Sequence, residues 1–332
     1  MLTPRHWPTW LLLGLAWPVA QLPYPLLLRI GRLIGTGAYW LQRKRHRRAA
    51  KQLRLCFPTM SDHARKRLQL ANAQSYGIGV MERLIGWWWP VRRSERLLNS
   101  VAGIEHLQRA QREGRGVILL VPHTTTMDIC ATLLRRHVEV DFMYRAAPNP
   151  VIEWVQRRGR SRPDVAPLDS AGADTAAIES ASTRALVRRL RAGRVVWYSP
   201  DRDFGPAKAH VFAPLFGMPA ATITATTRYA KMSGAQVMTL NYWRDAQGGY
   251  SLRFGAPLPH FPGDSEVDDC SRINAWVESA IREHPEQYRW VHKRFRTQPV
   301  AAVGDEALRP LSSKPAAANA AVAPATSRAT AA

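Results

Sequence analysis

Short apolar runs alternate with segments of helical periodicity through the middle of the chain. The runs have the length and the β-branched and aromatic content of strands, and they lie at 117–121, 138–144, 194–199, 235–243 and 250–256. Helical patterns separate several of them, at 150–160, 175–192 and 220–233. This alternation predicts an α/β fold with a mixed, largely parallel central sheet flanked by helices.

The segments on either side of this region have their own patterns. Residues 61–115 have apolar positions at helical spacing, and residues 268–296 are predicted to form a closing helix rich in arginine and aromatic residues. From residue 300 the chain is mostly Ala, Pro, Ser and Thr, which cannot bury enough apolar surface to offset the entropy of ordering. We therefore expect a globular domain at 41–299 and a disordered tail at 300–332.

The amino-terminal residues form a long uncharged segment. Residues 7–28 contain no charged side chain, and these 22 positions are enough to cross a bilayer at roughly 20 residues per span. Prolines at 18, 23 and 25 interrupt the segment, so a kinked or interfacial helix is equally compatible with it. A cleaved signal peptide is disfavoured, because the apolar stretch is long and no A-x-A-like site follows it. We predict a membrane-associated helix and a membrane anchor at 1–40.

The net charge narrows the choice of partners. The chain carries 47 Lys and Arg against 25 Asp and Glu, a formal charge of +22, which implies an anionic partner. A basic cluster without a single acid occupies residues 43–54, directly after the apolar segment. Basic residues in that position stay cytoplasmic and attract anionic lipid. Nucleic acid would explain the cluster but not the apolar segment, so a membrane surface is favoured and nucleic acid is not expected.

His123 and Asp128 are the strongest candidates for catalytic residues. They flank the transition from the apolar run 117–121 to a helix predicted to begin near Met127. A turn between strand and helix would allow the carboxylate to bond one imidazole nitrogen, leaving the other to take a proton from an attacking hydroxyl. The spacing alone is weak evidence, since chance supplies such pairs. Zinc is disfavoured, because no second His or Cys lies nearby at ligand spacing.

Two further groups are candidates for substrate binding. Arg145 ends the run 138–144, and Arg160 ends the next helical segment; arginines in such places bind phosphate or carboxylate, although a solvated basic face is the common alternative. Asp201 and Asp203 follow the run 194–199, and their loop should lie with His123 at the carboxyl edge of the sheet. A structural Asp turn is the alternative for one of these two acids.

A glycine-rich nucleotide loop is missing from the sequence, and the three cysteines are too widely spaced to suggest a metal cluster. We therefore expect no metal and no cofactor.

Several motifs, taken in order, resemble the late acyltransferases of lipid A biosynthesis, the lauroyl/myristoyl transferases of the glycerolipid acyltransferase superfamily. They are a tryptophan-rich apolar start, LRLCFPTMSD, Glu82 before IGWWW, GIEHLQRAQREGRGVILLVPH, YRAAPNP, RRGR, WYSPDRDFG and QYRWVHKRFRTQP. The resemblance places the catalytic motif of the family, His followed after four residues by an acid, on His123 and Asp128. It places the family's arginine on Arg160 and its Pro-Asp element on Asp201. The chain departs from the pattern in having Asp at 128, where most lauroyl-type members have Glu, and in a longer stretch at 161–183.

The resemblance implies an enzyme at the cytoplasmic side of a Gram-negative inner membrane. It would transfer an acyl group from acyl carrier protein to a hydroxyl of a Kdo-bearing lipid A precursor, with residues 41–299 as the acyltransferase domain. His123 would be the general base oriented by Asp128, while Arg145, Arg160, Asp201 and Asp203 would bind substrate or support the site. One rival is a lysophospholipid or other glycolipid acyltransferase that uses the same dyad, although SPDRDFG stands where an F-P-E-G-T-R-like element would be expected. The other rival is a non-enzymatic basic membrane tether or nucleic-acid binder.

Overall fold

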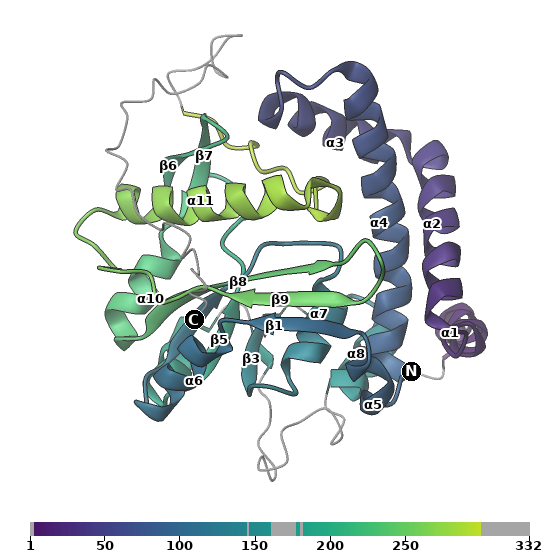
Figure 1. Cartoon of the computed structure of the whole chain (residues 1–332), viewed down its shortest axis with the longest axis horizontal. Coiled ribbons are helices and arrows are strands. Elements are labelled where there is room, and N and C mark those ends of the chain that lie inside the picture. Colours follow the sequence, from purple (N-terminus) through teal and green to yellow (C-terminus); the bar gives the residue numbers. More distant parts are fainter. Residues whose placement is uncertain (1–2, 145, 161–176, 180–181, 300–332) are drawn as a thin grey trace, which may run out of the picture.

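The computed structural model describes residues 3–144, 146–160, 177–179 and 182–299. In this part of the chain a seven-stranded sheet has the order β1-β9-β8-β2-β5-β3-β4 (Figure 1). All five predicted strands are present, as β2 (Val117–Leu120), β3 (Val140–Tyr144), β5 (Val195–Tyr198), β8 (Gln236–Arg244) and β9 (Tyr250–Phe254). The sheet also contains two strands that were not predicted, β1 (Leu98–Ala102) and β4 (Ala177–Glu179).

The sheet is mixed and largely parallel, as predicted. Its described pairs β1–β9, β8–β2, β2–β5, β5–β3 and β3–β4 are parallel, and β8–β9 is antiparallel. β2 and β5 are neighbours in the middle of the sheet, and every residue of both is buried. Because they are parallel, the loops that follow them leave the sheet at the same edge.

Alternate residues of the central strands supply two hydrophobic cores, one on each face of the sheet. Leu119 belongs to the core formed with α4 (Asp62–Trp88), α6 (Ile104–Arg112) and α7 (Met127–Leu134). Ile118 belongs to the opposite core, formed with helices that include α9 (Thr183–Arg191), α10 (Ala225–Ser233) and α11 (Glu266–Glu283). Helices on both faces explain why the strands are apolar along their whole length instead of alternating with polar residues.

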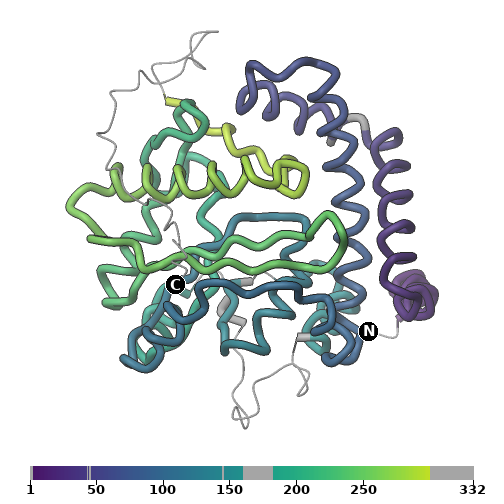
Figure 2. The backbone as a smooth tube through the Cα atoms, viewed as in Figure 1, coloured from purple at the N-terminus to yellow at the C-terminus, as the bar shows by residue number. Residues whose placement is uncertain are grey.

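The long helix α4 packs tightly against α2 (Tyr24–Leu41), and the two run side by side in Figure 2. Glycines allow the close approach. A Cβ atom built on Gly77 of α4 would lie only 2.0 Å from the carbonyl oxygen of Gly31 in α2. Any larger residue at 77 would therefore push the two backbones apart.

The apolar amino-terminal segment forms two helices instead of one. α1 (Trp7–Ala20) ends before Pro23, whose extended backbone precedes α2. This agrees with the kinked alternative. None of the described helices combines the length and the apolar character needed to cross a membrane.

Four predicted helices have different boundaries in the structure. In the segment predicted at 175–192, residues 177–179 form strand β4, and helix α9 begins only at Thr183. Residues 61–115 are not one helical region, because α5 (Val91–Glu95), β1 and α6 follow α4. The segment 220–233 begins as strand β7 (Met218–Ile223), which pairs with β6 (His210–Leu215), and becomes helical only at α10.

The closing helix α11 ends at Glu283. The prediction that the helix continues to residue 296 is therefore wrong, and only a short 3-10 turn at Pro285–Gln287 follows it. The predicted helix at 150–160 is confirmed as α8 (Pro150–Arg160). The tail at 300–332 and most of the stretch 161–183 lie outside the described residues.

Candidate active site

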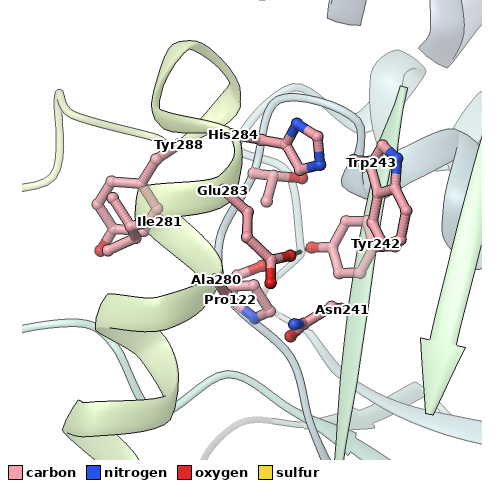
Figure 3. Close-up of a pocket in the computed structure, with 10 residues that line it drawn as sticks. Pro122, Asn241, Tyr242, Trp243, Ala280, Ile281, Glu283, His284 and Tyr288 are labelled. Atoms are coloured by element: carbon pink, nitrogen blue, oxygen red, sulfur yellow. Dashed lines mark hydrogen bonds between the residues drawn. The ribbon is translucent and has the colours of Figure 1, made fainter. Parts of the chain in front are cut away.

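His123 lies three residues beyond Leu120, which forms the last described residue pair of β2 and β5, at the carboxyl edge of the central sheet. Its backbone is held on the side of β8, where the Tyr242 hydroxyl donates a hydrogen bond to the Pro122 carbonyl (Figure 3). The loop after β5 leaves the sheet at the same edge and carries Asp201. The sequence argument that places these two loops together is therefore confirmed.

Asp201 binds His123 through both carboxylate oxygens. The His123 Nδ1 atom lies 2.6 Å from Oδ1 of Asp201, and the His123 backbone N–H donates to Oδ2 at 2.9 Å. The carboxylate is fully buried. Burial alone would raise the pKa of Asp201, but the charge of His123 and its two hydrogen bonds outweigh burial and hold that pKa below its usual value.

An ionised Asp201 determines which nitrogen of His123 carries the proton. A carboxylate can only accept, so Nδ1 of His123 must donate, and in the neutral ring Nε2 is then the acceptor. An imidazole in this tautomer can accept a proton from a hydroxyl group, and the adjacent carboxylate stabilises the imidazolium that results. His123 and Asp201 therefore have the geometry of a general base and its orienting carboxylate.

Asp128 does not occupy the position that the sequence analysis gave it. Its Oδ2 atom accepts from Nε of Arg83 at 3.0 Å, and both side chains are about one-third exposed. Asp128 belongs to the first turn of α7, whereas the His123 ring is turned toward the loop after β5. The sequence analysis assigned Asp128 as the carboxylate on one imidazole nitrogen of His123; the carboxylate at Nδ1 is instead Asp201, which that analysis had given only a supporting role.

Asp203 has a structural role in the described residues. Its Oδ1 accepts from the N–H of Gly205 at 2.8 Å, an Asp turn, and its two oxygens also accept from the N–H and the hydroxyl of Thr297. These contacts favour the Asp-turn alternative over substrate binding, and they tie the loop after β5 to residue 297.

The two predicted arginines cannot be placed in the site. Arg145 lies outside the described residues. Arg160 is the last residue of α8, and only its backbone belongs to the described part. A contact of either arginine with substrate stays a prediction.

The segment 284–299, which the sequence analysis expected to be helical as far as residue 296, instead crosses the loop between β2 and α7, residues 121–126, which we call the catalytic loop. The Arg289 N–H donates to the His123 carbonyl at 3.0 Å, and the Thr125 N–H donates to the Gln287 carbonyl at 2.8 Å. On the other side, the amide of Asn72 in α4 donates to the carbonyls of Glu286 and Tyr288. The crossing segment is therefore held between α4 and the loop that carries His123.

A buried ion pair supports the same loop from α4 and β8. Glu82 and Arg244 are bonded to each other and are at most about one-tenth exposed. Burial raises the pKa of Glu82, against the opposing charge of Arg244 and a hydrogen bond from Tyr250. Arg244 also donates to the Ser75 hydroxyl, which shares a 2.6 Å hydrogen bond with Thr125. Neither Arg244 nor Ser75 had a sequence signal that pointed to this network.

A large cavity opens beside His123. Its volume is about 1060 Å³, at the upper end of the usual size of ligand pockets. Its apolar lining includes Trp87, Met127, Ala131, Phe142 and Trp197, and its cationic lining includes Arg83, Arg135, Arg202, Lys208 and Arg228. Asp128 lies in the same wall. The arrangement suits a ligand with a long apolar part and an anionic part.

A second, much smaller cavity lies behind the catalytic loop. Figure 3 shows it between α11 and β8, with His284 near Trp243; the two rings stack at 5.1 Å. Its volume of about 10 Å³ is at the lower limit for one water molecule, so it cannot hold a substrate.

Cys130, the cysteine closest in sequence to His123, is not suited to act as a nucleophile. Cys130 is fully buried in α7, and burial, reinforced by the charge of Glu82, raises the pKa of its thiol well above the usual value. Such a thiol stays protonated at neutral pH and is a poor nucleophile. Among the described residues, no three His, Cys, Asp or Glu side chains gather where they could hold a metal ion.

A histidine held by a buried aspartate, next to a large cavity with apolar and cationic lining, forms a site suited to acyl transfer. Residues 1–297 match the family of bacterial lipid A biosynthesis acyltransferases, and the chain belongs to this family. It is an acyltransferase of lipid A biosynthesis.

Three relatives from two organisms illustrate the similarity. The chain is 37% identical to the lipid A biosynthesis lauroyltransferase of Escherichia coli K12 and 35% identical to its palmitoleoyltransferase; each alignment covers 90% of this chain and 94% of the relative. It is 31% identical to a lipid A biosynthesis acyltransferase of Haemophilus influenzae, over 90% of this chain and 93% of the relative.

Proposed function

We propose that the protein transfers a lauroyl- or myristoyl-like group from acyl carrier protein to a hydroxyl of a Kdo-bearing lipid A precursor, with His123 as the general base. The observation that carries the proposal is the His123–Asp201 pair, whose histidine lies in the wall of the large cavity. The names of the relatives support a fatty acyl donor and a lipid A acceptor.

In this mechanism Nε2 of His123 removes the proton from the acceptor hydroxyl as its oxygen attacks the thioester carbonyl. The carbon–oxygen bond of the new ester forms, and the oxyanion collapses with cleavage of the carbon–sulfur bond. The proton on His123 then passes to the departing thiolate of the carrier. Asp201 stays ionised throughout and stabilises the imidazolium.

The oxyanion requires a fixed donor. The cavity wall supplies two kinds, the backbone N–H groups at the start of α7 and the guanidinium groups of Arg83 and Arg202. The cationic side chains of the wall also suit a phosphorylated acceptor and an acidic carrier protein. Asp128 lies among these groups, where it holds Arg83 in place by their ion pair.

We further propose that α1 lies in the surface of the inner membrane, with the catalytic domain on the cytoplasmic side. Large apolar side chains on α1 are 55–67% exposed, namely Trp7, Leu11, Leu12, Leu15 and Trp17. A patch of this kind, followed by the basic helix α3 (Arg43–Cys56), is typical of helices that lie in a membrane interface.

The function is tested with membranes that contain the wild type or His123→Ala. Each is given a panel of acyl carrier protein thioesters and the Kdo-bearing precursor, and the lipid products are read by mass spectrometry. We expect a mass gain of one acyl group with the wild type alone. Equal product from both proteins would refute the role of His123. If the folded wild type gave no product with any thioester, the proposed donor and acceptor would be wrong.

Membrane binding is tested separately by cosedimentation with vesicles of anionic and of neutral lipid. Replacing Leu11, Leu12 and Leu15 together with Ser should release the protein from both kinds of vesicle. Val267→Ser, which removes an exposed apolar side chain from α11, is the control and should bind like the wild type. Unchanged binding of the triple variant would contradict the placement of α1.

A further inference from the structure

A second imidazole lies against the His123 ring. The centroids of His123 and His292 are 4.9 Å apart and their planes make an angle of 65°, an edge-to-face arrangement. His292 belongs to the segment that crosses the catalytic loop, and two backbone hydrogen bonds of 3.0 Å fix its position, from its N–H to the Arg289 carbonyl and from the Arg294 N–H to its own carbonyl. Since the Arg289 N–H also holds the His123 carbonyl, the backbones of the two histidines share one frame.

The surroundings of His292 keep its ring neutral. Its Nδ1 atom is buried and has no hydrogen-bond partner among the described residues. Burial and the positive charges of His123, Arg289 and Arg202 lower the pKa of His292 to about 3, against the opposing charge of Asp201. At neutral pH a ring without charge therefore faces the base.

His123 needs a second constraint besides Asp201. The carboxylate fixes Nδ1 and the backbone N–H, but a single hydrogen bond to a ring atom leaves the tilt of the ring free. A ring packed edge-to-face removes this freedom, because aromatic pairs prefer this geometry and the neighbour occupies the space into which the imidazole would swing.

We propose that His292 is a positioning residue for the acyl-transfer reaction, whose ring packs edge-to-face against His123 and holds the plane of the base toward the cavity. This inference rests on the proposed role of His123. In this role the His292 ring orients the His123 ring by packing against it and by being uncharged, and it does not transfer a proton itself. A charged ring would oppose the imidazolium that forms on His123 during turnover.

The test compares His292→Ala with His292→Phe, which keeps a flat uncharged ring. His284→Ala is the matched control, because His284 comes from the same segment but stacks on Trp243 instead of His123. We expect His292→Ala to lower kcat about 10- to 100-fold with KM for donor and acceptor unchanged within twofold, as misplacement of a catalytic group does. His292→Phe and His284→Ala should retain kcat within about threefold, and the pH profile of His292→Phe should overlay that of the wild type.

A double variant separates positioning of His123 from a general structural role. In the His123→Ala background, His292→Ala should lower the residual rate no further, because the base that it positions is gone. The proposal is overturned if His292→Ala keeps wild-type kcat, if His292→Phe is as impaired as His292→Ala, or if the two losses multiply. If His123→Ala itself is fully active, the proposed mechanism fails instead.

Discussion

Replacement of Asp201 by Asn tests the central contact of the site. An asparagine has one acceptor oxygen where the aspartate has two, but both Asp201 oxygens are engaged, with Nδ1 and with the backbone N–H of His123. If the amide oxygen of Asn at position 201 still accepts the hydrogen bond from the His123 backbone N–H, the NH₂ group of the same amide must face Nδ1 of His123. Nδ1 then accepts, the ring proton moves to Nε2, and His123 can no longer act as a base.

The size of the effect follows from this change of tautomer. The corresponding Asp-to-Asn change in a serine-protease triad lowers kcat about 10⁴-fold without disturbing the geometry. We expect Asp201→Asn to lower kcat about 10³- to 10⁴-fold, about 4–5.5 kcal/mol at 1.36 kcal/mol per tenfold. Asp128→Asn is the matched comparison: it breaks a partly exposed ion pair worth about 0–1 kcal/mol, so kcat should fall no more than about fivefold.

The assay is the initial rate of acyl transfer at saturating donor and acceptor, with the fold of each variant checked by circular dichroism. If Asp128→Asn costs as much as Asp201→Asn, or if Asp201→Asn stays within tenfold of the wild type, the assignment of Asp201 as the orienting carboxylate is wrong.

Three further predictions concern stability. Gly77→Ala should lower the free energy of unfolding by about 1–3 kcal/mol, because the new Cβ would overlap the α2 backbone. Gly37→Ala, which has open space around its Cβ, should be neutral or stabilising. Chemical denaturation measures both changes. Glu82→Gln leaves a buried arginine without a counter-charge and should cost about 3–5 kcal/mol, while Glu283→Gln, at an exposed pair, should cost at most about 1 kcal/mol in the same measurement. The pKa of His292 is about 3 in the folded state and 6.5 in the unfolded state, so protons bind the unfolded state first as the pH falls. The stability that the protein gains from keeping His292 neutral is therefore complete above pH 6.5 and is lost as the pH falls toward 3. Between pH 7.5 and 5.5 the wild type should therefore lose about 1 kcal/mol more than His292→Phe, and parallel losses would contradict this reasoning.

The sequence predicted the parts of the fold that depend on burial on both sides of the sheet. The apolar runs that became β2 and β5 are continuous because helices cover both faces of the sheet. β1 was missed because its exposed positions leave a weak pattern at the edge of the sheet. The segment 284–296 was misassigned because its aromatic residues, among them Tyr288 and Trp290, are fixed by tertiary contacts in one hydrophobic core, which residue spacing does not reveal.

The same limits apply to the site. His123 could be found because it stands at the end of a buried strand, and the parallel-sheet argument placed the Asp201 loop beside it. Which carboxylate reaches Nδ1 depends on side-chain directions, and residue spacing does not determine these. His292 lies 169 positions along the chain from His123, and no local pattern links the two.

The hydrogen bonds from residues 286–297 to the catalytic loop and to Asp203 have a consequence for the order in which the enzyme matures. A ribosome delivers α1, with its exposed tryptophans and leucines, long before it delivers Arg289 or Thr297. The exposed apolar side chains of α1 are thus present while the loop around His123 still lacks its last hydrogen-bond partners. The enzyme can therefore become active only after residues 286–297 have been synthesised and have formed these hydrogen bonds.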